Sequence, residues 1–405
     1  MPDAVTKGVP YAAALYLALV QFLFVTCWTI YVIFLPGLLE TAGLPRRYAP
    51  WILLLDQLVF MVMDVVAGVA ADRTARVLGR LGPLIVGITA ASCVAFLLLP
   101  HAARWGELAP VVFLTLLILW AATSSALRAP PWVLLSRDAA APSVPWINAL
   151  ALTGLALGGA AAPYLGIALK NLDPRLPFAL SSLTLLATTA GLVWVERVVA
   201  RQPAAPAASA PPRLGAAGWL FIAGCLLLAQ GFQVHFSLNS AGQYLRFAAP
   251  GQLPYLMPVF WVGFNLAMFP GAALAGRYGA LPVIAAAALV GAAGVVASNL
   301  STGLDQLLAA QFVAGGAWGC ALMAAFSAAV DFGRSGREGH ALGWLFAALA
   351  GATLARIAVA IAELNKHPGL ARALEWAPSV LWFAAALLFV ALVWARAAAG
   401  RPASS

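Results

Sequence analysis

Charged residues are scarce in this 405-residue chain. Asp, Glu, Lys and Arg make up only 9% of it, whereas hydrophobic residues make up 63%. A soluble domain needs far more polar surface than this composition supplies. Apolar runs long enough to cross a bilayer recur from one end of the chain to the other. The composition therefore excludes an ordinary soluble protein and predicts an all-α integral membrane protein.

Cysteine and the common catalytic motifs are also rare or missing. The four cysteines lie singly inside apolar runs, with no Cys-x-x-Cys or Cys/His spacing, so neither a disulfide framework nor a metal site is expected. His-Glu-x-x-His, Gly-x-Ser-x-Gly and a Walker-type Gly-Lys-Ser/Thr do not occur. We therefore expect no enzymatic activity, no catalytic residues, no metal and no cofactor.

Basic residues outnumber acidic ones, and the formal net charge is +9. They form short clusters between apolar runs, as the preference for basic loops on the cytoplasmic side predicts. Orientation in a membrane explains them better than nucleic-acid binding. More of the basic loops fall on the side that carries both termini, so we expect cytoplasmic termini in a bacterial inner membrane. The expected partners are the lipid bilayer and a small-molecule substrate, and the chain is expected to be a monomer.

The apolar runs divide at Pro, Gly and charged residues into twelve predicted transmembrane helices. The predicted spans are 11–36, 48–70, 81–100, 108–128, 145–169, 177–198, 215–240, 253–276, 281–300, 304–330, 340–363 and 376–396. The first run is far longer than the apolar part of a signal peptide and has no cleavage pattern after it. We expect it to be retained as the first span.

A Pro- and Ala-rich segment separates the sixth span from the seventh. Its sequence, RQPAAPAASAPPR, is too polar and too broken to span a membrane. It predicts a cytoplasmic linker at 201–214 between a six-helix bundle at 1–200 and a second one at 215–405. Two joined six-helix halves are typical of transporters, whose substrate site lies between the halves near the bilayer midplane.

At this point the chain resembles the major facilitator superfamily, over essentially its whole length. Gly68, Asp72, Arg73 and Arg76 match the signature of that superfamily between helices two and three. The resemblance implies twelve helices, secondary transport, and a role for these four residues as a conformational latch between the halves. A longer match is similar to the glycoside-pentoside-hexuronide cation symporters, the melibiose carrier group. It comprises Asp64, Gly68, Asp72, Thr74, Gly79 and Pro83.

Asp64 is the most informative single residue. If Asp72 marks the cytoplasmic end of its helix, Asp64 lies about 12 Å deeper, near the middle of the bilayer. A carboxylate there needs a partner, water or a function. The sugar symporters carry Asp-x-Pro-x-Trp in helix four, where this chain has Arg128 to Trp132. Because arginine cannot bind sodium, proton coupling or no coupling is favoured over sodium coupling. Asp64 is a structural partner of Arg128, a proton or cation site, or both at once.

Other polar residues are further candidates for coupling. Asp56 lies eight residues before Asp64 and could line the outer vestibule or reach headgroup water. His235 could carry a proton, or it could be a neutral packing residue. Arg356 and Glu363 are seven residues apart and are predicted to share a helix face, either as a structural pair or as coupling groups.

Polar and aromatic side chains within the spans predict the wall of a substrate cavity. The seventh span is unusually rich in hydrogen-bonding groups, which favours a hydrophilic solute. Tryptophan and tyrosine could stack on sugar rings. The cavity candidates are Trp28, Tyr31, Trp132, Gln230, Gln233, Asn239, Trp261 and Asn265. The small-residue stripes Gly154-x-x-x-Gly158 and Gly315-x-x-x-Gly319 predict close packing of helices that rock against each other.

Together these features predict a secondary active transporter that works by alternating access. The expected activity is symport of a sugar, glycoside or organic acid, with a proton, and less readily sodium, as the coupling ion. One alternative is a proton-driven exporter of amphipathic compounds, which the abundance of Ala, Leu and Phe would suit. Another is a non-transporting membrane sensor built on the same fold.

Overall fold

The computed structural model describes residues 11–77, 80–136, 143–199, 214–334 and 336–399, and these residues form helices and short connections without a strand. The helices of the first half are α2 Tyr11–Thr41, α3 Ala49–Val77, α4 Gly82–Leu98, α5 Ala109–Ser124, α6 Ala129–Ser136, α7 Val144–Leu169, α8 Arg175–Ala190 and α9 Leu192–Val199. Those of the second half are α10 Ala216–Phe232, α11 Ser240–Tyr244, α12 Leu253–Leu256, α13 Pro258–Tyr278, α14 Ala280–Leu300, α15 Leu304–Gly333, α16 Glu338–Ile361 and α17 Pro368–Ala399.

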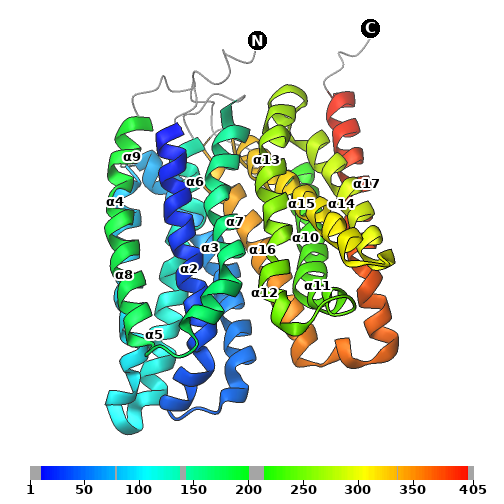
Figure 1. Cartoon of the computed structure of the whole chain (residues 1–405). Coiled ribbons are helices and arrows are strands. Elements are labelled where there is room, and N and C mark those ends of the chain that lie inside the picture. The colour runs from blue at the N-terminus through cyan, green and yellow to red at the C-terminus, as the bar shows by residue number, and fades with distance from the viewer. Residues whose placement is uncertain (1–10, 78–79, 137–142, 200–213, 335, 400–405) are drawn as a thin grey trace.

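The two sets of helices stand side by side as two bundles (Figure 1). The beginning of α2 and the end of α17 lie at the same end of the molecule, at the top of Figure 1. We call this the termini end and the opposite one the far end. Among the described residues, 11 helical ranges are long and apolar enough to cross a membrane, and Gly82–Leu135 alone contains two of the predicted spans. The predicted all-helical membrane fold is confirmed.

Two of the predicted spans differ from the structure in a way that matters for the site. The fourth was predicted as one helix ending at Arg128, but α5 ends at Ser124 and a 3₁₀ turn leads to Arg128, whose φ of −97° and ψ of −93° are not helical. Proline residues then open α6, since proline suits the first helical turn. The seventh span continues from α10 into a π-helical segment, Gln233–Asn239. Each irregular segment contributes side chains to the space between the bundles, Arg128 from the first and Gln233 from the second.

Glycines allow the closest approaches between helices. A methyl group added to Gly154 would overlap the backbone of Ala18 in α2, and one added to Gly315 would overlap that of Phe260 in α13. Close packing at both predicted stripes is thus confirmed, but each lies within one half rather than between the halves. A close approach between the halves occurs at Gly68, where an added methyl group would overlap the carbonyl of Gly339 in α16.

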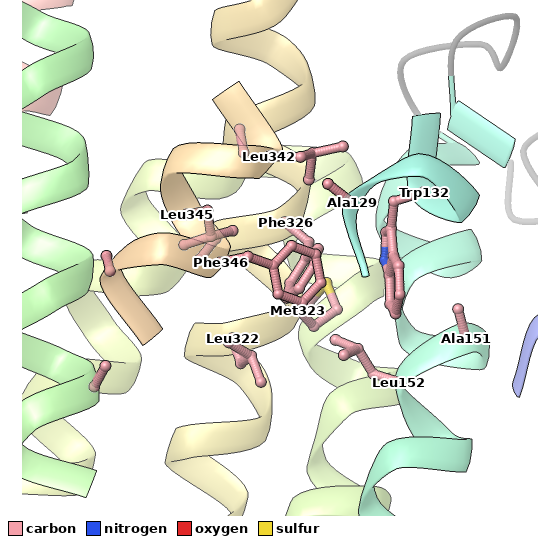
Figure 2. Packing of buried hydrophobic residues seen from close by; sticks show 14 of the residues in the cluster. Ala129, Trp132, Ala151, Leu152, Leu322, Met323, Phe326, Leu342, Leu345 and Phe346 are labelled. Atoms are coloured by element: carbon pink, nitrogen blue, oxygen red, sulfur yellow. The ribbon is translucent and has the colours of Figure 1, made fainter. Parts of the chain in front are cut away.

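The two halves meet mainly where α3 packs on α16 and where α7 packs on α13 and α15. On the termini-end side, Trp132 of α6 packs on Phe326 and Phe346, with ring centroids 4.9 and 5.7 Å away. Figure 2 shows this contact, with Leu152 of α7 and Met323 of α15 close to the same rings. Nearly all of the predicted linker at 201–214 lies outside the described residues.

Candidate functional site

A cavity of about 380 Å³ lies between the two halves and is lined by helices of both. Its polar and charged lining residues are Gln21, Gln57, Arg128, Gln233, Ser237, Thr353 and Arg356. Its aromatic lining residues are Phe24, Trp28, Phe60, Phe232, Phe236, Trp261, Trp318 and Phe346. The volume falls within the range of roughly 300–1,000 Å³ that is usual for small-molecule sites.

Arg128 and Asp64 form an ion pair at the wall of this cavity. Nε of Arg128 lies 3.0 Å from Oδ2 of Asp64, without the alignment of a hydrogen bond. The Asp64 side chain is fully buried, whereas the Arg128 side chain is 15% exposed and reaches the cavity. The structure therefore brings together the two residues that the sequence offered as either a pair or a proton site. The carboxylate sits behind the arginine rather than in the cavity itself.

Two aromatic rings hold the Arg128 guanidinium. Its Cζ atom lies 4.8 Å from the ring centroid of Phe60 in α3 and 5.1 Å from that of Phe346 in α16. Cation–π attraction of this kind is stronger where water is excluded. The break between α5 and α6 carries Arg128 into this position. One side chain thus links an acid of the first half to a ring of the second.

Gln233 and Arg356 contribute the polar wall on the side of the second half. Nε2 of Gln233 donates a hydrogen bond of 2.9 Å to Oγ1 of Thr353, which belongs to α16. Ser237 lies next to Gln233, at 3.4 Å from its Oε1. Arg356 lies one turn beyond Thr353 on α16 and is half-buried. None of the ion pairs among the described residues includes Arg356, and its Nε has no hydrogen-bond partner.

The aromatic candidates fall into two groups. Trp28 and Trp261 line the cavity, as the sequence predicts for a substrate site. Tyr31 and Trp132 do not: both are fully buried, and Tyr31 donates a hydrogen bond of 2.7 Å to Oδ2 of Asp56. Aromatic residues recur throughout this chain, so their type alone does not tell which ones face the cavity.

Asp56 is likewise buried inside the first half and is not among the cavity residues. Its position against Tyr31 does not fit the expected vestibule or headgroup contact. The predicted position of Asp56 was wrong because the apolar residues around it in α3 do not indicate which face of the helix is turned inward.

His235 belongs to a chain of buried amides in the second half. Its Nε2 lies 3.1 Å from Oε1 of Gln311, and the Gln311 amide donates to Gln243, which in turn donates to Asn299. Asn299 then donates to the carbonyl of Glu375 in α17. His235 is fully buried and does not line the cavity. The sequence analysis missed Gln311 and Gln243, although amides within apolar spans are a usable signal.

The remaining polar candidates also lie away from the cavity. Asn239 donates to the carbonyl of Leu374, and Asn265 donates to the carbonyl of Trp261 in its own helix. Gln230 is half-buried and is not a lining residue. The π-helical segment turns only Gln233, Phe236 and Ser237 toward the cavity.

Glu363 does not share a helix face with Arg356. The helix α16 ends at Ile361, and Glu363 adopts a left-handed conformation with φ of 54°. It is exposed and pairs with Lys366 at 2.7 Å, and this hydrogen bond lowers the pKa of Glu363 below its ordinary value. The predicted pairing is wrong because the periodicity was extended past the end of the helix.

The four residues predicted to form a latch lie at the termini end, where α3 meets the beginning of α16. The two carboxylate oxygens of Asp72 accept hydrogen bonds of 2.7 and 2.8 Å from the backbone N–H groups of Gly339 and His340. A carboxylate at the first turn of a helix also interacts favourably with the helix dipole. Arg76 donates to the carbonyl of Gly336 at 3.2 Å, whereas Arg73 is exposed. Asp72 therefore acts as a cap for a helix of the opposite half.

No family model and no curated protein sequence matches this chain. Solved structures do. The fucose:proton symporter FucP of E. coli is 15% identical, with a TM-score of 0.68 over 95% of this chain and 98% of that one. The human organic anion transporter MFSD10 is 15% identical, with a TM-score of 0.71 over 94% and 99%. A bacterial homologue of the iron transporter ferroportin, in its outward-facing state, is 15% identical, with a TM-score of 0.73 over 94% and 99%.

A further structure of FucP, described as a major facilitator superfamily transporter, has a TM-score of 0.69. The chain therefore has the major facilitator fold over nearly its whole length. These neighbours carry different solutes by their descriptions, so the likeness establishes the fold and not the substrate. The resemblance to the melibiose carrier group stays a prediction.

Proposed function

We propose that this protein is a secondary active transporter that carries a small polar solute through the central cavity by alternating access. The solute class is a sugar, glycoside or organic acid, and the coupling ion is a proton. The observation that carries the proposal is the buried Asp64–Arg128 pair, which lies at the wall of a cavity between two bundles. The proposal needs no cofactor, because Asp64 binds the proton and the two halves of the chain carry out the movement.

The pair offers a simple way to couple proton binding to movement. While Asp64 is ionised, its attraction for Arg128 at 3.0 Å amounts to roughly 5 kcal/mol before desolvation costs, at an effective dielectric constant of about 20. A proton on Asp64 removes this attraction, and Arg128 is then free to contact solute. Because Arg128 also stacks on Phe346, its release changes a contact between the two halves.

The latch supports the alternating-access part of the proposal. Asp72 and the close contact at Gly68 hold the termini end shut, while the cavity lies between the bundles further along. Opening this end would require both contacts to break. We propose that the termini end faces the cytoplasm of a bacterial inner membrane, and the bias of basic loops supports this orientation. We propose residues 1–200 and 215–405 as the two moving units of a monomeric carrier.

A second candidate is a proton-driven exporter of amphipathic compounds. The observation in its favour is the largely aromatic cavity wall, to which Phe232 and Trp318 contribute a stacked pair with centroids 4.7 Å apart. Both candidates share the fold and the proton site, and they differ in the direction of net flux. Flux measured under opposite proton gradients separates them.

Proton movement in proteoliposomes tests the proposal directly. Purified full-length protein is reconstituted with a pH-sensitive dye inside, and gradients of galactose, glucuronate or naphthalene-2-sulfonate are applied. At least one solute should drive proton flux in the wild type and in Asp305→Asn, which removes an exposed acid. Asp64→Asn should abolish proton flux but keep solute exchange. Proton flux that survives in Asp64→Asn would refute the coupling role, and the absence of flux with every solute would refute the transporter.

A further inference from the structure

The most unusual charge in the cavity is Arg356, because no acid in the described chain balances it. The two charged residues that line the cavity are Arg128 and Arg356, and both are cations. Asp64 offsets Arg128 from behind. The acid next along the chain from Arg356 is Glu363, which lies beyond the helix and is paired with Lys366. The cavity therefore carries a net positive charge that is concentrated at Arg356.

An unbalanced arginine in the cavity wall is open to a counter-charge from outside the protein. Arg356 is half-buried, lies about 7.5 Å before the end of α16, and keeps an Nε–H without a hydrogen-bond partner. Burying a charge among apolar helices is costly unless it is paired or hydrated. A solute with a negative group would supply the missing partner, and guanidinium groups bind carboxylate and similar oxyanions through paired hydrogen bonds.

The surroundings of Arg356 limit what the rest of that solute can be. Thr353 lies one turn before Arg356 on α16 and accepts a hydrogen bond from Gln233. These two side chains form a small polar patch beside the cation. Further along the cavity the wall is aromatic, with Trp261, Trp318 and Phe346 among its members. Phe346 lies ten residues before Arg356, or about 15 Å along the helix. The site thus offers one cationic end and a long apolar body.

We infer that the cavity binds an amphipathic organic anion, with its negative group on Arg356 and its ring system against the aromatic wall. The inference rests on the proposed transport function and narrows its solute class to organic acids that carry an apolar ring. A neutral sugar would leave Arg356 without a counter-charge, and a cationic compound would be repelled by both arginines. Size agrees, because about 380 Å³ accommodates a fused-ring acid but not a large lipid.

Binding to the purified full-length protein in detergent tests the site with three matched probes. Naphthalene-2-sulfonate carries both ring and charge, naphthalene-2-sulfonamide carries the ring alone, and methanesulfonate carries the charge alone. Calorimetry should show binding of the first that is at least tenfold tighter than that of either of the others. Equal affinity for the sulfonate and the sulfonamide would overturn the role of charge. Equal affinity for the two sulfonates would overturn the role of the ring.

Two variants of Arg356 then locate the charge. Arg356→Gln should weaken naphthalene-2-sulfonate about tenfold or more, the loss expected for one charge-assisted contact, and should leave the sulfonamide unchanged. Arg356→Lys should recover part of the affinity, because it keeps the charge but loses the fork of donors. Arg47→Gln, which removes an exposed charge at the far end, should bind as the wild type does. An equal loss for both ring probes in Arg356→Gln would instead show a structural role.

Uptake of labelled naphthalene-2-sulfonate into proteoliposomes separates this inference from the function on which it rests. Binding that depends on Arg356, without flux in either direction, would overturn the transporter and leave the anion site standing. Flux of a neutral solute that is the same in the wild type and in Arg356→Gln would overturn the anion site and leave the transporter standing. Flux of the anion that falls with Arg356→Gln supports both.

Discussion

The guanidinium of Arg128 lies over the ring of Phe346, with 5.1 Å between its Cζ atom and the ring centroid. The same guanidinium is 3.0 Å from the buried carboxylate of Asp64. Arg128 belongs to the first half of the chain and Phe346 to the second. The charge of Asp64 therefore acts on a side chain that contacts both halves. This geometry makes the ion pair part of the interface between the two halves rather than a contact within one half.

Removing Arg128 alone should destabilise the protein strongly. Arg128→Gln leaves the Asp64 carboxylate buried without a counter-charge, which typically costs about 3–5 kcal/mol in the free energy of unfolding. The double variant Asp64→Asn with Arg128→Gln should recover most of that loss, because no charge is then buried. Unfolding by titration with SDS in mixed micelles measures both. The same loss from Arg128→Gln in the wild type and in Asp64→Asn would mean that the two residues are not coupled.

A methyl group at Gly68 should loosen the termini end. The added carbon in Gly68→Ala would overlap the carbonyl of Gly339, and a helix backbone cannot yield locally as a flexible side chain can. The halves should therefore separate at this end while each stays folded. Spin labels at the exposed positions Arg73 and Arg334, one on each half, should show a new population at longer distance.

Gly87→Ala provides the matched control for this change. Gly87 lies in α4, and an added methyl group there meets no atom within 4 Å. It should leave the distance distribution of the spin labels unchanged. If Gly68→Ala gives the wild-type distribution as well, the contact between α3 and α16 does not limit closure.

Much of the fold followed from the sequence because its signals are strong and local. Long apolar runs and their breaks predicted the spans, and the termini of most helices lie within a few residues of those predictions. The exceptions have physical reasons. Arg128 interrupts the fourth span because a charged side chain precedes two helix-opening prolines, and the π-helical segment at Gln233–Asn239 leaves no mark in composition.

The site was only partly predictable, since helices that are apolar all round do not reveal which face turns inward. Asp64 and Arg128 stood out because charges inside a membrane are rare, and they do lie together. Gln57 and Thr353 line the cavity without having been singled out. Glu363 was placed beside Arg356 because the predicted span ended at residue 363, two residues beyond the end of α16 at Ile361. Which side chains line the cavity depends on contacts between helices that are distant in the sequence.

The cap that Asp72 provides should hold the termini end shut. Asp72→Asn removes the negative charge from the first turn of α16, where it accepts from Gly339 and His340. A favourable charge at a helix N-terminus contributes up to about 2 kcal/mol, so the ratio of closed to open molecules should fall by up to roughly thirtyfold. A cysteine in place of Leu342, which is fully buried in the closed state, should react correspondingly faster with a maleimide.

This experiment requires a background in which the four native cysteines are replaced by alanine. Asp331→Asn is the matched control, because it removes an exposed acid at the same end of the molecule without touching α3. Its labelling rate should equal that of the background. A rate for Asp72→Asn that matches the control would show that the cap does not govern closure.

The buried amide chain of the second half should matter for stability and not for coupling. Oε1 of Gln311 accepts a hydrogen bond from Nε2 of His235, and Nε2 of Gln311 donates to Oε1 of Gln243. Gln311→Leu therefore leaves Nε2 of His235 and Oε1 of Gln243 without these partners. Each unsatisfied buried polar group costs about 1–3 kcal/mol, and SDS titration should show a loss of that order or more. His235→Asn should lose less stability, because an amide can still bond to Gln311.

Since His235 does not line the cavity, solute-driven proton flux in His235→Asn should keep the pH dependence of the wild type. A shifted pH profile would instead make His235 part of the coupling path, in spite of its distance from the cavity wall.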